Sequence, residues 1–203
     1  MSLQKIDKYQ ERYLAHQLDK QQQLIAIMNE RHSNRIFKNT PVEEEKINSL
    51  IKVIDAIPSS CDRKAISVKV ITDKDQKALL GGILVGGVGW IHRAPAILLV
   101  MADPKAYKAE NEINFMPYLD GGIAAQQLAL MATTLGIHGC FANPNIRSFN
   151  KEHFQKVFGP GILTMAFAIG YPEPPEETVQ KLKKAIKALE KTKKSPHESI
   201  NNL

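Results

Sequence analysis

An uninterrupted apolar run from Pro95 to Ala102 constrains the fold more than any other feature of this 203-residue chain. It has the length of a strand and falls far short of the roughly 18 apolar residues that a membrane span needs. A strand in which apolar and polar residues do not alternate is buried on both faces. We therefore expect a central strand in a sheet that is covered on both sides.

The sequence around this run predicts further elements. Residues 67–72 are β-branched at nearly alternate positions and predict a strand, and a second buried strand is expected over 163–169. A helix is expected over 40–58, because a proline and three glutamates near its start favour helix initiation. A short helix is expected at 75–80.

The longest apolar helix is predicted for residues 117–135 and is expected to end at Gly136. It has more apolar surface than one small domain readily covers, so we expect pairing with a second copy. The face that packs inward is expected to use Ile123, Gln127 or Leu128, Met131 and Leu135.

The length of the chain indicates one α+β domain with a single core. Residues 1–30 are predicted to be an N-terminal helical extension, and residues 31–203 the folded domain. This domain is expected to include a basic C-terminal helix over 176–194. The apolar stripe of that helix is expected to turn inward with Val179, Leu182, Ile186 and Leu189.

The net charge of +6 is concentrated in the C-terminal tail, where residues 178–203 hold seven lysines and two glutamates. Surfaces that bind nucleic acid usually interleave arginines or aromatic residues with lysines, and this tail has neither. We therefore expect a solvated helix face and no nucleic acid partner. The N-terminus lacks the apolar core of a signal peptide, which predicts a cytoplasmic protein. Cys61 and Cys140 fit neither a zinc site nor a disulfide scaffold, so no metal is expected.

The segment Arg31-His32-Ser33-Asn34-Arg35 is the first candidate binding motif. In an extended chain its two guanidinium groups and its serine hydroxyl project to one side. Guanidinium groups suit a doubly charged phosphate, and the hydroxyl adds a neutral donor. By spacing alone, a solvated basic turn would look the same.

Two more segments could reach a ligand. The polar loop Ser59-Ser60-Cys61-Asp62-Arg63-Lys64 joins a helix to a strand, where an ordinary turn is an equally good interpretation. The loop from Gly86 to Trp90 has neither the Rossmann nor the P-loop pattern. Its glycines allow close backbone approach to a flat ligand, and Trp90 could stack on a ring or anchor the core.

In this order and spacing, these segments resemble the FMN-dependent nitroreductase family from about Arg31 to Pro172. The Arg31–Arg35 segment is similar to the family's phosphate-binding start, and Pro58-Ser59-Ser60 is similar to its segment along the flavin. The other similar motifs are Ala94-Pro95, Asp120-Gly121-Gly122-Ile-Ala-Ala-Gln126-Gln127, Leu135-Gly136-Ile137 and Ile169-Gly170-Tyr171-Pro172.

This resemblance implies an α+β sandwich with a mixed, mainly antiparallel sheet, and a homodimer with FMN at the subunit interface. It also implies ping-pong chemistry, in which NADH or NADPH reduces the flavin and an acceptor such as a nitroaromatic or a quinone takes the electrons. No catalytic side chain is assigned, because the flavin carries the chemistry. The residues implied to bind the cofactor are Arg31, His32, Ser33, Arg35, Ser59, Ser60, Asp62, Lys64, Gly87, Trp90 and Asn143.

The sequence departs from the family pattern in three places. The stretch Asp62-Arg63-Lys64 stands where the family has an asparagine followed by Gln-Pro-Trp, which is expected to change the field at the flavin edge. Acidic residues and prolines at 173–177 displace the family's second set of basic phosphate ligands, for which Lys181 or Lys183 could substitute. The glycine-rich loop with Trp90 is expected to leave a shorter lid over the cofactor.

The sequence leaves other functions open. A flavin-dependent dehydrogenase or reductase of one dedicated metabolite fits the same fold, and so does a non-catalytic flavin carrier. A basic-tailed nucleic-acid binder would be colourless and would bind in a salt-dependent way. The sequence determines neither the physiological acceptor nor the preference for NADH or NADPH.

Overall fold

The computed structural model describes residues 3–173, 180–181, 183–184 and 186–187. The chain divides into two compact units, Met1–Tyr171 and Pro172–Leu203. The first unit contains a four-stranded sheet with the strand order β1-β2-β4-β3. The strands are β1 (Ile66–Ile71), β2 (Ala96–Ala102), β3 (His138–Ala142) and β4 (Ile162–Gly170).

Each neighbouring pair of strands in this sheet is antiparallel. Parallel pairing occurs at an isolated bridge between Ser33 and Gly139, which extends the edge beyond β3. The predicted α+β class with a mainly antiparallel sheet is therefore confirmed. The predicted central strand is confirmed as well, because β2 is buried at every position and lies between β1 and β4.

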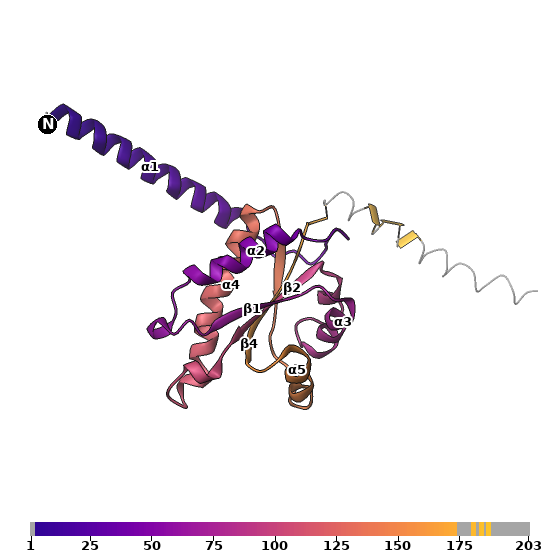
Figure 1. The fold of residues 1–203 in the computed structure, drawn as a ribbon. Coiled ribbons are helices and arrows are strands. Elements are labelled where there is room, and N and C mark those ends of the chain that lie inside the picture. The colour runs from indigo at the N-terminus through magenta and orange to yellow at the C-terminus, as the bar shows by residue number, and fades with distance from the viewer. Residues whose placement is uncertain (1–2, 174–179, 182, 185, 188–203) are drawn as a thin grey trace, which may run out of the picture. The chain divides into compact units, whose positions relative to one another are not determined.

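Helices cover the sheet on both faces (Figure 1), with α2 (Glu44–Lys52) and α4 (Met116–Thr134) on one side, and α3 (Lys74–Ile83) and α5 (Lys151–Phe158) on the other. Alternate residues of β2 serve the two cores. Leu98 and Val100 pack with the α2 and α4 side, while Ile97 and Leu99 pack with the α3 and α5 side. Burial of β2 on both faces thus follows from its uniformly apolar sequence.

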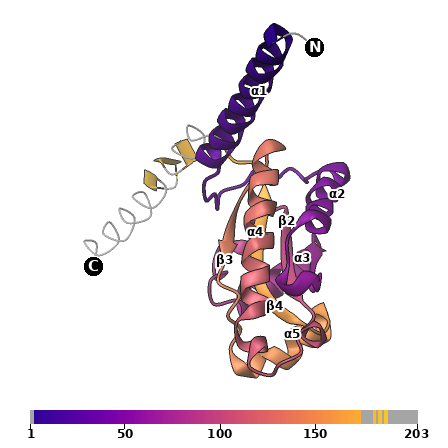
Figure 2. The ribbon, with the colours of Figure 1, turned by 90° about the vertical axis from the view of Figure 1, so that its left-hand side faces the viewer.

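Helix α4 lies along the sheet (Figure 2), but the predicted packing face was wrong in part. Leu128 is fully buried as expected, whereas Ile123 is 38% exposed and Met131 and Leu135 are only partly buried. The other buried residues of this helix are Pro117, Asp120, Thr133 and five glycine or alanine residues. A side chain at Gly121 would bring its Cβ to 2.2 Å from Thr164 Oγ1 of β4, so the glycine allows the close approach of helix and sheet.

The N-terminal residues form one long helix, α1 (Leu3–Glu30), which ends where the predicted extension ends. The described side chains from Gln10 to Ala26 are all exposed, and Ile27 in the last turn is partly buried. The helix of residues 40–58 was predicted too long, because α2 begins at Glu44 and a short 3-10 turn follows it over Val53–Ala56.

Strand β3 and helix α5 were missed in the sequence. The residues of β3, His-Gly-Cys-Phe-Ala, include no β-branched residue, and α5 has only eight residues. Both elements form because of the tertiary environment: β3 pairs with β4, and Phe154 and Phe158 of α5 fill the second core.

In the second unit, the described residues between 180 and 187 are helical, and Lys181 forms an ion pair with Glu173. Of the predicted apolar stripe, Val179, Leu182 and Leu189 lie outside the described residues, and Ile186 is 54% exposed. Within the described part of the chain, none of the helices has the length and apolar character needed to cross a membrane.

Candidate functional site

The segment Arg31–Arg35 continues from the end of α1 along the free edge of β3. Ser33 forms a parallel bridge with Gly139, and the amide of Asn34 donates to the Gly139 carbonyl over 2.9 Å. Arg31 and Ser33 line a small pocket with Thr133 near the end of α4. Among the described residues, no carboxylate forms an ion pair with Arg31 or Arg35. Their positive charges are therefore available for an anion.

Trp90 and Arg35 come together although they are distant in sequence. The guanidinium carbon of Arg35 lies 5.5 Å from the centre of the Trp90 ring, and the indole nitrogen donates to the Gly86 carbonyl over 2.8 Å. Trp90 is partly buried at the margin of the second core. The indole therefore lies at the edge of the core, beside an arginine of the predicted binding segment.

The glycine-rich loop lies directly against the segment that follows β3. A side chain at Gly86 would bring its Cβ to 2.4 Å from the backbone nitrogen of Asn143, so only glycine allows this approach. The amide of Val85 donates to the Asn145 carbonyl over 3.0 Å. Gly87 is buried beside Ile91. The fold thus brings Gly87, Trp90 and Asn143 into one region; their contact with a cofactor remains a prediction.

Two histidines lie beside this region. The rings of His32 and His138 have their centres 4.5 Å apart, and His32 Nδ1 is 2.9 Å from the Glu30 carbonyl. Partial burial lowers the pKa of His138, and the neighbouring His32 lowers it further. His138 was missed in the sequence because it lies at the start of the unpredicted strand β3.

The polar loop from Ser59 to Lys64 has an unusual backbone. Cys61, Asp62 and Lys64 have φ values of 51°, 54° and 49°, in the left-handed region that costs a non-glycine residue roughly 1–2 kcal/mol. The Ser59 hydroxyl accepts from the Lys64 amide over 3.0 Å. The side chains of Asp62 and Lys64 are exposed, so both are available to a ligand.

This loop is held in place by Asp120 of α4, which is 1% exposed. Asp120 accepts hydrogen bonds from the amide and the hydroxyl of Ser60, over 2.9 and 2.8 Å, and from the Tyr107 hydroxyl over 3.0 Å. Burial and the bond to Asp120 raise the pKa of Tyr107. The Ser60 hydroxyl is thus engaged inside the protein, and a carboxylate within an apolar helix was the signal that could have identified Asp120.

Arg63 points back into the protein instead of toward solvent. Its side chain is 13% exposed, forms an ion pair with Glu112 at 3.2 Å, and lies with its guanidinium carbon 5.6 Å from the centre of the Tyr107 ring. Within the stretch Asp62-Arg63-Lys64, which departs from the family pattern, Arg63 therefore anchors the loop. Asp62 and Lys64 determine the charge that the loop exposes.

The predicted site residues form two separate groups. Arg31 and Ser33 lie near Thr133 at one end of α4, whereas Ser60 is bonded to Asp120 near the other end. The rise of about 1.5 Å per residue separates Asp120 from Thr133 by about 20 Å along the helix axis. The two groups therefore lie toward opposite ends of α4.

A profile of the nitroreductase family matches residues 28–87 and 83–171, which is well over half of the chain. The chain belongs to the nitroreductase family. The match begins in the last turn of α1 and ends at Tyr171, just beyond β4. The family region thus contains the sheet, its covering helices and every predicted cofactor-binding residue.

Known proteins agree with this assignment. An FMN reductase [NAD(P)H] of Bacillus subtilis (strain 168) is 31% identical over 81 residues, which is 40% of this chain and 32% of the relative. A nitroreductase family protein from Streptococcus pneumoniae has the same fold, with a TM-score of 0.65 and 14% identity over 73% of this chain and 90% of that one. The NADPH:FMN oxidoreductase of Vibrio harveyi, solved with NAD+, has a TM-score of 0.64 and 21% identity over 74% of this chain and 69% of that one.

Proposed function

We propose that this chain is an FMN-dependent NAD(P)H oxidoreductase that reduces a nitroaromatic or quinone-like acceptor. Family membership supports the proposal, and so does the activity named for the Bacillus subtilis relative. The structural observation that carries it is the pair Arg31 and Arg35, for which the described residues supply no carboxylate partner. Both arginines lie on the segment that runs beside β3.

The residues present fit FMN at two points. Arg31, Ser33 and Arg35 supply two cations and a hydroxyl, the donor set that a phosphate monoester requires. The glycine-rich loop lies against the backbone of Asn143 because position 86 has no Cβ, and the Trp90 indole donates a hydrogen bond to the carbonyl of the same glycine. We propose that Arg31, Ser33 and Arg35 hold the phosphate and that Gly87, Trp90 and Asn143 border the ring.

FMN, when bound, supplies the redox chemistry by accepting a hydride equivalent from NAD(P)H and passing electrons to the acceptor. The protein's part is to bind and orient. Arg35 lies over Trp90, which fixes the indole between the predicted phosphate site and the glycine-rich loop. The strained Ser59–Lys64 loop presents the charges of Asp62 and Lys64 in a set geometry, because Asp120 and Arg63 hold its backbone from inside.

We further propose that the working unit is a homodimer in which each flavin contacts both copies. The about 20 Å between the two groups of predicted residues supports this arrangement, because the Ser59–Lys64 loop of one copy could then reach the phosphate segment of the other. The outer face of α4 is apolar and exposed, with Phe115, Tyr118, Leu119 and Ile123 between 38% and 57% exposed. Such a surface favours association.

The experiment starts from the purified protein, reconstituted with FMN under anaerobic conditions. A flavin absorption band that is bleached by NADH or NADPH and restored by a nitroaromatic or a quinone is the expected result. An apoprotein that takes up no FMN would contradict the proposal. A band that neither nucleotide bleaches would identify a flavin carrier instead of an enzyme.

The phosphate assignment is tested with Arg31→Ala and Arg35→Ala. Each arginine is expected to contribute charge-assisted hydrogen bonds of roughly 1.5–3 kcal/mol, so each variant should bind FMN about one to two orders of magnitude more weakly. Arg12→Ala is the matched control, because Arg12 is exposed on α1. Equal FMN titration curves for all three variants and the wild type would remove the two arginines from the site.

A further inference from the structure

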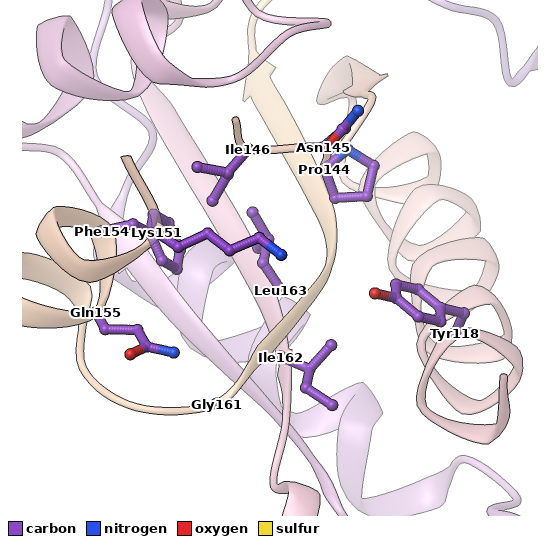
Figure 3. Close-up of a pocket in the computed structure, with 10 residues that line it drawn as sticks. All are labelled: Tyr118, Pro144, Asn145, Ile146, Lys151, Phe154, Gln155, Gly161, Ile162 and Leu163. Carbon is purple, nitrogen blue, oxygen red and sulfur yellow. The ribbon is translucent and has the colours of Figure 1, made fainter. Parts of the chain in front are cut away.

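A cavity of about 250 Å³ lies apart from the predicted flavin residues, between α4, α5 and the first residues of β4. Its walls are the segment Pro144–Ile146, the start of α5, Gly161–Leu163 and Tyr118 of α4. Figure 3 shows these residues arranged around an open space, with α5 on one side and α4 on the other. None of the residues that the sequence singled out for cofactor binding lines it.

The floor of this cavity is apolar and belongs to the protein core. Ile146, Phe154 and Leu163 are each less than 9% exposed and pack into the second hydrophobic core. Pro144 and Ile162 extend the apolar surface toward the rim. A floor built from core side chains keeps its shape without a ligand, which lowers the entropic cost of binding.

The rim carries polar groups. In Figure 3 the ammonium group of Lys151 extends into the open space from one side, and the hydroxyl of Tyr118 points toward it from the other. Among the described residues, no carboxylate forms an ion pair with Lys151. In the part of the chain that the structure describes, no acidic side chain lines the cavity, and its other polar lining residues are Asn145 and Gln155. The rim therefore favours a single negative charge and offers neutral hydrogen-bonding groups beside it.

The cavity adjoins the predicted flavin site through one backbone segment. Asn143, which lies against Gly86, is followed directly by Pro144 of the cavity wall. Asn145 lines the cavity with its neighbours, while its carbonyl accepts from the Val85 amide of the glycine-rich loop. The segment 143–146 thus contacts the glycine-rich loop and also forms one wall of the cavity. A ligand in the cavity would therefore touch residues that adjoin the proposed flavin site.

We infer that this cavity binds a small aromatic carboxylate, with the ring on the Ile146, Phe154 and Leu163 floor and the carboxylate between Lys151 and Tyr118. The volume lies below the roughly 300–1,000 Å³ of pockets for drug-sized ligands, which limits the ligand to about one ring.

Benzoate is the probe, and benzamide is its uncharged control of nearly equal shape. Calorimetric titration of the full-length protein is expected to give a dissociation constant for benzoate on the order of 0.1–1 mM. Benzamide should bind at least about threefold more weakly, because it cannot pair with the ammonium group. Raising the salt concentration to about 0.5 M should weaken benzoate binding and leave benzamide binding unchanged.

Three variants locate the ligand. Lys151→Met should weaken benzoate binding by about three- to tenfold without affecting benzamide, and Tyr118→Phe should weaken benzoate binding by a smaller factor. Lys156→Met is the matched control, because Lys156 is exposed on the same helix and does not line the cavity. Equal loss in Lys151→Met and Lys156→Met, or equal binding of benzoate and benzamide to the wild type, would overturn the inference.

The two proposals can fail separately. Benzoate titration does not require flavin, so binding by a protein that takes up no FMN would leave the cavity assignment standing and refute the oxidoreductase proposal. Conversely, an active flavoprotein that does not bind benzoate would refute the cavity assignment and leave the oxidoreductase proposal standing.

Discussion

Asp120 illustrates how much one buried side chain decides in this protein. Its carboxylate accepts three hydrogen bonds, two from Ser60 and one from Tyr107, and through them it joins α4 to the Ser59–Lys64 loop. Three residues of that loop have left-handed backbone conformations. Such strain persists only where surrounding contacts over-determine the conformation. We therefore infer that Asp120 positions the loop for the flavin without touching the flavin itself.

Replacing Asp120 by alanine should destabilise the protein by about 2–4 kcal/mol, because it leaves the partly buried Ser60 donors and the buried Tyr107 hydroxyl without an acceptor. Asp120→Asn retains one acceptor oxygen, so its loss of unfolding free energy should be about half as large. Urea unfolding measures both. A purely structural role predicts unchanged FMN affinity per folded molecule, whereas a positioning role predicts weaker affinity for Asp120→Ala with partial recovery in Asp120→Asn. Asp103→Asn, at an exposed helix cap, is the control.

His138 makes stability depend on pH. Burial and the neighbouring His32 lower its pKa in the folded state below the ordinary value of 6.5. The unfolded chain therefore binds a proton more readily, and stability should be lost as the pH falls below about 6.5 toward the lowered pKa. His138→Gln removes this proton-binding site. The measurement is the urea midpoint of the apoprotein between pH 5 and 8. It should fall less steeply toward low pH in the variant than in the wild type. Equal slopes for the two proteins would assign the pH dependence to other groups.

The two faces of helix α4 have different environments. Helix α4 buries one face against the sheet, through small residues that allow close packing, and leaves Leu119 and Ile123 on its outer face. An apolar outer face on a helix that already has a covered inner face indicates a second partner. We propose that this partner is the α4 face of a second copy.

Ile123→Glu and Leu119→Glu test this interface. A C2 interface presents each substitution twice, and burying an unpaired carboxylate there is strongly unfavourable. Each variant should raise the dissociation constant of the dimer by about two orders of magnitude, as measured by sedimentation. Gln126→Glu adds the same charge to an exposed position of α4 and should have a smaller effect, because it removes no apolar surface. A wild-type monomer at micromolar concentration would exclude the dimer.

For the whole molecule, the central question is how two distant groups of residues form one site. Arg31 lies near the end of α4 and Arg35 lies against Trp90, while Asp62 and Lys64 belong to the loop that is bonded to Asp120. A helical separation of about 20 Å exceeds the reach of a side chain. We propose that a two-fold dimer resolves this by placing the loop of one copy near the arginines of the other.

Mixing two damaged variants tests this arrangement. One variant carries Arg31→Ala with Arg35→Ala, and the other carries Asp62→Ala with Lys64→Ala, so each homodimer has only damaged sites. Co-expression with different tags yields heterodimers, in which one site is intact and the other doubly damaged. The purified heterodimer should regain FMN binding at about half of its sites. No recovery in the heterodimer would place each site within a single chain.

The sequence by itself determined those features that follow from local chemistry. The apolar run that ends at Ala102 indicated a strand buried on both faces, and Gly136, with φ of 68°, ends α4 as predicted. The motifs from Arg31–Arg35 to Ile169-Gly170-Tyr171-Pro172 indicated the family, and the family match over residues 28–171 confirms it. These signals depend on neighbouring residues, which a sequence displays directly.

Only the tertiary structure decided what depends on contacts between distant residues. Helix α4 is apolar almost all the way round, so its periodicity could not show that Ile123 faces outward. Strand β3 has weak intrinsic propensity and forms because it pairs with β4. Asp120 and Ser60 meet across 60 positions of the chain. No local pattern records such a contact, because burial and hydrogen bonding between distant segments are properties of the folded chain.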